Sequence, residues 1–234
     1  MEQKRVVRYI MFGLLYFTQG TILSYFTALN ALYLLQYGID MTRIGIMGTI
    51  ALIPFVIKVF LGMLSDKVNV LGLGHRKPYI VIGLVVQIMC LIFVPLINPG
   101  KDFWLYVAIA FLLQMGMALY DTCTDGLALD TTPVAEKGTI QGFMVGGRAV
   151  GVIVTASLVG LLAENVSWSA VFWVLAVLTL PPFFFLHTVK EAPRVQERAF
   201  DWKAFSAFKQ LPVIGLSIIR SEEHTSELQS PNTI

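Results

Sequence analysis

Four ionisable side chains, Lys58, Asp121, Asp125 and Arg148, stand inside long apolar stretches of the sequence. Asp121 and Asp125 are four residues apart, so on a helix their carboxylates share one face, one turn apart. Two carboxylates at this spacing repel each other unless a cation or a proton lies between them. The pattern therefore permits two kinds of chemistry: proton transfer on a carboxylate, and ion pairing with a basic neighbour.

The elements that must hold these side chains are membrane spans. Hydrophobic residues make up 56% of the 234 positions, charged residues make up 14%, and the mean hydropathy is +0.72. This composition predicts an all-α integral membrane protein. Six apolar runs each have about the 20 residues that a helix needs to cross the bilayer. They cover residues 9–35, 44–64, 78–97, 103–127, 139–162 and 168–187.

Basic residues divide unevenly between the two sets of loops. Twelve Lys and Arg lie at the N-terminus and in the second, fourth and sixth loops, whereas the other side carries only Arg43 and Lys101. By the positive-inside rule, the N-terminus is expected in the cytoplasm of a multi-pass protein of the inner or plasma membrane. Orientation accounts for the basic loops, so we expect no nucleic-acid partner.

The estimated depths of these charged residues in the membrane predict that their side chains lie close together. At a helical rise of about 1.5 Å per residue, Lys58, Asp121 and Arg148 lie about 21, about 27 and about 15 Å from the starts of their spans. All three fall in the cytoplasmic half of the bilayer. Either the basic residues neutralise the aspartates and hold the helices together, or an Asp takes up a proton and a basic residue binds an anionic solute.

Two further features of the spans allow structural predictions. Asp130 precedes Thr131-Thr132-Pro133, so we expect it at a helix end in contact with water.

Small residues within spans allow helices to approach closely. Close packing is expected at Gly20, Gly116, Gly142, Gly146, Gly147 and Gly151.

The loop between the second and third spans reads GMLSDKVNVLGLGHRKPY, residues 62–79. It resembles the loop motif of the major facilitator superfamily, G-x-x-x-D-(R/K)…G-(R/K)-(R/K), with a longer middle and His75 where Arg is commoner. The resemblance implies a cytoplasmic gating motif. Its members here would be Gly62, Asp66, Lys67, Gly74, Arg76 and Lys77.

Within the superfamily, the sequence is similar to the AmpG-type muropeptide permeases and their acetyl-CoA transporter relatives. The similar segments are YFTQG at residues 16–20, LIPFVIKVFLG at residues 52–62 with Lys58, the D-x-x-x-D of span four, and GGRAVG at residues 146–151 with Arg148. One departure is that the acidic residue usual soon after the second Asp is displaced into ALDTTP.

The resemblance implies a twelve-helix fold built from two six-helix halves, with a solute site between them near the midplane. The chain would be the N-terminal half, with a bundle at residues 1–188, a cytoplasmic linker at 189–210 and the truncated start of a seventh helix at 211–219. Residues 220–234 read as a translated sequencing adapter. We therefore expect a non-native tail and a natural gene that continues beyond Ile219.

The function that the resemblance implies is a secondary active transporter that moves a polar or anionic solute by alternating access, coupled to protons. The coupling and binding candidates are Lys58, Asp121, Asp125 and Arg148. The expected partners are the solute, protons, the lipid bilayer and the missing C-terminal half, with no cofactor and no metal. A glycoside-cation symporter-like transporter and a non-transporting assembly factor on the same fold are the alternatives.

An enzyme is not expected. An intramembrane aspartyl protease needs a second catalytic Asp in a Gly-x-Gly-Asp context on another span, and the sequence contains no such segment. A nucleotide-binding Gly-x-x-x-x-Gly-Lys-Ser/Thr segment is absent as well, so the chain carries no pump motor.

Overall fold

The computed structural model describes residues 2–70, 74–165, 167–189 and 191. These residues form helices joined by short loops, with no strand among them. Of the predicted linker, 189–210, only Val189 and Glu191 are described. The predicted start of a seventh helix, 211–219, and the predicted tail, 220–234, lie outside the described residues, so both stay predictions.

The six predicted membrane spans are confirmed. The first contains α1 (Glu2–Ser24), a π-helical turn (Tyr25–Leu29) and α2 (Asn30–Gln36), and the second contains α3 (Met41–Val56) and α4 (Lys58–Lys67). The third is α5 (Lys77–Phe93) with a short 3₁₀ turn, the fourth is α6 (Phe103–Thr131), and the fifth is α7 (Lys137–Asn165). The sixth contains α8 (Trp168–Leu178) and α9 (Pro181–Leu186).

Local chemistry sets several of the helix boundaries. Asp40 caps α3 by accepting a hydrogen bond from the backbone N–H of Arg43 at 3.0 Å, and this bond lowers the pKa of Asp40. Pro54 lacks a backbone N–H, and within one turn of it the helix breaks at Ile57. Lys58 therefore begins a new helix, α4, instead of continuing α3.

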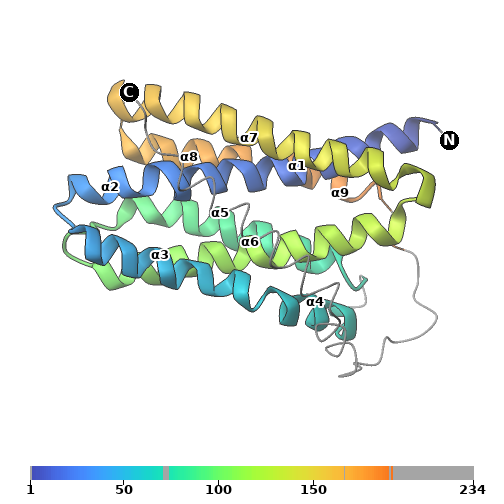
Figure 1. Ribbon diagram of the computed structural model, residues 1–234, viewed down its shortest axis with the longest axis horizontal. Helices are drawn as coiled ribbons and strands as arrows, with labels where there is room; N and C mark the ends of the chain where they lie inside the picture. The colour runs from blue at the N-terminus through green and yellow to red at the C-terminus, as the bar shows by residue number, and fades with distance from the viewer. Residues whose placement is uncertain (1, 71–73, 166, 190, 192–234) are drawn as a thin grey trace, which may run out of the picture. The chain divides into compact units, whose positions relative to one another are not determined.

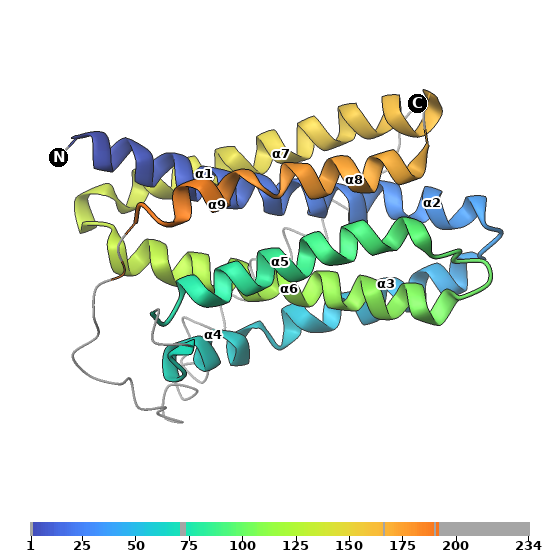
Figure 2. The same cartoon turned by 180° about the vertical axis from the view of Figure 1, so that it is seen from behind.

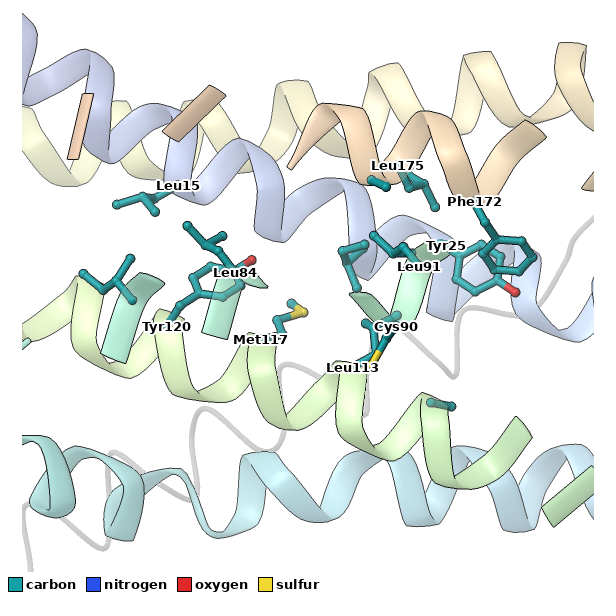
Figure 3. Packing of buried hydrophobic residues seen from close by; sticks show 14 of the residues in the cluster. Leu15, Tyr25, Leu84, Cys90, Leu91, Leu113, Met117, Tyr120, Phe172 and Leu175 are labelled. Carbon is teal, nitrogen blue, oxygen red and sulfur yellow. The ribbon is translucent and has the colours of Figure 1, made fainter. Parts of the chain in front are cut away.

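The helices lie side by side in one bundle. Both views show α3 and α4 at one edge and α7 at the other, with α1, α5 and α6 between them (Figures 1 and 2). Buried apolar side chains fill the centre. Figure 3 shows Met117 and Tyr120 extending from α6 into the cluster that also contains Leu15 of α1 and Leu84 of α5.

The tightest helix contact joins α1 and α7, and it depends on glycine. A Cβ atom added to Gly147 would overlap the carbonyl oxygen of Gly13, and one added to Gly20 would overlap the carbonyl oxygen of Arg148. Because lipid is as apolar as a leucine side chain, such close backbone packing, rather than burial from water, holds membrane helices together. The α1–α7 pair is therefore closely packed along these glycines.

Four of the six glycines predicted to pack closely do so, namely Gly20, Gly116, Gly147 and Gly151. The prediction for Gly142 and Gly146 is wrong within the described part of the chain, where an added Cβ would meet no atom within 4 Å. Both residues lie on a face of α7 turned away from α1. Glycine content alone does not say which face of a helix meets a neighbour.

Gly147→Ala is expected to destabilise the bundle by about 1–3 kcal/mol, because the new methyl group must push α1 and α7 apart. Gly138→Ala is the matched control on the same helix, since Gly138 has open space around its Cα. That change should be neutral or slightly stabilising, because Ala favours a helix over Gly by about 1 kcal/mol. Thermal unfolding of both variants in detergent measures the difference, and equal midpoints would contradict the packing argument.

Candidate functional site

An ion cluster joins the second and fourth spans. The Lys58 ammonium pairs with the Asp121 carboxylate and lies 3.5 Å from Oδ2 of Asp125. The Asp121 side chain is 4% exposed, whereas that of Asp125 is 41% exposed. Successive turns of α6 hold the two carboxylates, and the helix break before Lys58 brings the ammonium to them from α4.

Tyr16 adds the first span to this cluster. Its hydroxyl donates a hydrogen bond to Oδ1 of Asp125. In the sequence, Tyr16 stands out only as the first residue of the YFTQG segment, which predicts no role for it. A phenol near one charged residue in a membrane span is a signal, but its partner lies 109 positions away, so only the packing of α1 against α6 identifies it.

The charges in the cluster do not balance. One ammonium faces two carboxylates, so with every group ionised the net charge is −1. An ionised side chain costs about 2.5–3.5 kcal/mol in the bilayer even on the lenient insertion scale. A proton on either carboxylate would make the cluster neutral. The described residues contain no group of three or more metal-binding side chains.

Arg148 forms no salt bridge with the cluster. Among the described residues it has none within 4 Å, so the direct ion pairs to the aspartates come from Lys58. The Arg148 guanidinium nevertheless interacts electrostatically with the Asp121 carboxylate. Arg148 lies on the exposed side of α7 and lines a cavity of about 360 Å³.

The cavity lies among α1, its π-helical turn, α2, α3, α6 and α7. Its polar lining comes from Gln19, Thr27, Asn30, Gln114 and Arg148. The side-chain oxygens of Gln19 and Gln114 are buried and accept no hydrogen bond from the described residues. Buried polar atoms are normally paired, so these two oxygens retain unused hydrogen-bonding capacity beside the cavity.

The residues of the predicted gating motif form a second ionic cluster at the end of the bundle where the N-terminus lies. The side chain of Arg76 is only 7% exposed and bridges two carboxylates, Asp66 at 3.0 Å and Asp130 at 2.8 Å. Asp130 lies near the end of α6 and is exposed, yet it also pairs with Arg76, which the sequence analysis did not predict. The Arg76 guanidinium packs against Gly126, where any Cβ would overlap it.

The remaining motif residues lie in the helix ends and the loop around this cluster. An added Cβ on Gly62 would come within 2.8 Å of Thr122 on α6, so Gly62 allows α4 to approach α6. Lys67 ends α4 and is exposed, and Lys77 begins α5. Gly74 has a φ of +120°, which non-glycine residues rarely adopt.

Glu191, which follows the sixth span in the sequence, binds the backbone of the same loop. Its carboxylate accepts hydrogen bonds from the backbone N–H groups of His75 at 3.0 Å, Arg76 at 3.0 Å and Lys77 at 3.4 Å. These donors form the N-terminal turn of α5, where a negative charge is stabilised. The sequence analysis assigned Glu191 only to a linker, because an acidic residue in a polar stretch does not reveal which helix it caps.

A third ion pair lies at this end of the bundle. Arg8 of α1 pairs with Glu136, which also accepts a hydrogen bond from Tyr9 at 3.0 Å and lies 3.3 Å from Arg5. Glu136 belongs to the short turn between α6 and α7 (Val134–Glu136). This contact ties the start of the first span to the loop between the fourth and fifth spans.

The sequence profile of the Major Facilitator Superfamily matches residues 10–223. This match covers most of the chain, so the chain belongs to the Major Facilitator Superfamily. With six apolar helices of spanning length, it is a multi-pass integral membrane protein.

Three curated proteins show sequence similarity to the chain. The chain is 25% identical to "Putative transporter AmpG 2" of Rickettsia typhi over 84% of its length and 47% of the relative's. It is 25% identical to "Folate-biopterin transporter" of Synechocystis sp. over 86% of its length and 42% of the relative's. It is 23% identical to "Anhydromuropeptide permease" of Escherichia coli K12 over 70% of its length and 32% of the relative's.

These relatives confirm the predicted resemblance to AmpG-type permeases and group the chain with transporters and permeases, not with enzymes. The chain spans less than half the length of each of these relatives.

The ion cluster leads to a prediction about the free energy of unfolding of the protein. Lys58→Met is expected to destabilise the protein by about 3–5 kcal/mol, because it leaves the buried Asp121 carboxylate without its cation. Asp121→Leu likewise removes the more buried partner of the ammonium and leaves it with Asp125 alone. The double variant removes both charges, so it should be more stable than the single variants would predict if their effects simply added. A double-mutant cycle from thermal unfolding in detergent measures the coupling, and additive effects would contradict the pairing.

Proposed function

We propose that the chain is part of a secondary active transporter that moves an anionic polar solute by alternating access, coupled to protons. The observation that carries the proposal is the unbalanced cluster of Lys58, Asp121 and Asp125 in the membrane-spanning part of the bundle. Orientation by the positive-inside rule supports a cytoplasmic N-terminus in an inner or plasma membrane.

The charge cluster and the cavity lie next to each other along three of the membrane spans. Gln19, Phe55 and Met117 line the cavity. Tyr16, Lys58 and Asp121 follow or precede them by three, three and four residues, which is about one helical turn. A change of charge in the cluster is thus transmitted to the cavity through the turn that separates them on each element. This proximity supports coupling between proton uptake and solute binding.

The proton cycle can be described with the cluster's own residues. With one carboxyl protonated, the Lys58 ammonium and the remaining carboxylate form a neutral pair. When the proton leaves, the ammonium is shared between both carboxylates, 3.5 Å from Oδ2 of Asp125. Asp125 is the more exposed of the two and also accepts the Tyr16 hydroxyl hydrogen bond, so we assign the proton exchange to Asp125.

The cavity favours a solute with an anionic group and several hydrogen-bonding groups. Arg148 can bind a carboxylate or phosphate through two parallel hydrogen bonds, and the unpaired oxygens of Gln19 and Gln114 can accept hydrogen bonds from solute N–H or O–H groups. Two relatives are named for folate-biopterin and for anhydromuropeptide. Folates and muropeptides both carry carboxylates, so these two classes are the first solutes to test.

Open helix faces support the presence of a second half. Gly45 and Gly48 on α3, and Gly138, Gly142 and Gly146 on α7, have open space around them in the described part of the chain. α3 and α7 lie at opposite edges of the bundle, and both contribute to the lining of the cavity (Figure 1). We propose that the C-terminal half packs on these faces and closes the cavity during alternating access.

Asp125→Asn in the full-length protein is expected to abolish accumulation of solute driven by a proton gradient. The amide keeps a hydrogen-bond acceptor for Tyr16 but cannot take up a proton. Equilibrium exchange of labelled solute should persist, because exchange needs no net proton movement. Uptake into proteoliposomes with an imposed pH gradient, tested with folates and anhydromuropeptides, measures both activities.

The matched control for this experiment is Asp102→Asn, since Asp102 is exposed and precedes α6 at the opposite end from the cluster. Asp102→Asn should accumulate solute like the wild type. Normal gradient-driven accumulation in both Asp121→Asn and Asp125→Asn would exclude proton coupling through this cluster.

Arg148→Gln is expected to raise the KM for an anionic solute by about tenfold or more, because a hydrogen bond to a charged group contributes about 1.5–3 kcal/mol. Arg148→Lys should have a smaller effect, since it keeps the charge and loses the paired hydrogen bonds. Arg43→Gln is the control, at an exposed arginine in the loop end of α3. An unchanged KM in Arg148→Gln would contradict the role assigned to this residue.

A further inference from the structure

A second hollow of about 380 Å³ lies between α5 and α9, away from the cavity described above. Its walls include Val81 and Ile82 of α5 and Phe183 and Leu186 of α9. Figure 2 shows both helices on the near side of the bundle. No helix that lines the solute cavity contributes to this groove, so the two hollows are separate.

Two basic side chains stand at one end of the groove. Lys77 is the first residue of the third span, and His187 directly follows the sixth, so both lie at the same boundary of the membrane-spanning region. A lysine at this depth can lay its methylene stem along apolar surface and keep its ammonium at the level of the lipid headgroups. The groove is therefore apolar along its length and cationic where the bilayer meets water.

Glu191 is the acidic neighbour of this cationic end. Its carboxylate already accepts hydrogen bonds from the backbone N–H groups of His75, Arg76 and Lys77. The N-terminal turn of α5 thus stabilises the Glu191 charge through the backbone, and Lys77, which also interacts electrostatically with Glu191, lines the groove. His187 adds a hydrogen-bond donor in either protonation state.

We propose that this groove binds one anionic phospholipid from the leaflet at the N-terminal end of the bundle. An acyl chain would lie between α5 and α9, and the phosphate would contact Lys77 and His187. Basic pockets between membrane helices recognise anionic headgroups in this way. The bound lipid would hold the third and sixth spans together at the loop that contains Arg76. This inference does not depend on which solute is transported, or on transport itself.

Native mass spectrometry of the full-length protein in detergent tests the proposal. The protein is incubated with equal amounts of phosphatidylglycerol and phosphatidylcholine that have identical acyl chains. Wild-type protein is expected to retain phosphatidylglycerol over phosphatidylcholine by about fivefold or more, since each basic side chain near the membrane surface contributes about that factor. The Lys77→Gln/His187→Gln double variant should lose this preference.

Two further variants separate the groove from general effects. Ile82→Trp should fill the groove and lower retention of both lipids, whereas Val85→Trp, on the exposed side of α5 and outside the groove, should not. Lys101→Gln, an exposed lysine at the other end of the bundle, should keep the wild-type preference. Equal retention of the two lipids by the wild type, or an unchanged preference in the double variant, would overturn the proposal. A loss in Lys101→Gln as large as in the double variant would do the same.

Discussion

The ion pair between Lys58 and the two aspartates of α6 is the interaction on which the arrangement of this bundle depends. An ammonium in a membrane span is tolerated only where it meets a partner, so α4 must lie against the turns of α6 that carry Asp121 and Asp125. The helix break near Pro54 makes this contact compatible with the course of the second span. Tyr16 extends the same contact to α1, so three spans meet at one charged centre.

Close backbone packing provides the rigid frame around that centre. Gly13 against Gly147, and Gly20 against Arg148, bring α1 and α7 together without intervening side chains. Arg148 lies on the helix that is held in this way, and its side chain lines the cavity. The two basic residues therefore take different positions, with Lys58 in salt bridges to the aspartates and Arg148 at the cavity, from where it acts on Asp121 without a salt bridge.

The loops at the N-terminal end of the bundle are joined by charges of a different kind. Arg76 connects the ends of α4 and α6, Glu191 connects the start of α5 to the chain beyond α9, and Glu136 connects α1 to the loop before α7. Each contact lies at a helix end, where water and unpaired backbone groups reduce the cost of charge.

Much of this protein could be predicted from local patterns in the sequence. Apolar runs of spanning length identified the six membrane helices, and the four-residue spacing predicted that Asp121 and Asp125 share a face. Residue types alone could not predict the partners of Tyr16 or Glu191, the position of Arg148 at the cavity, or that Gly142 and Gly146 face away from α1. Hydrophobicity and spacing are properties of one helix at a time. The contact between two side chains on different helices depends on how each helix is rotated and tilted, and only the packing of the whole bundle decides that.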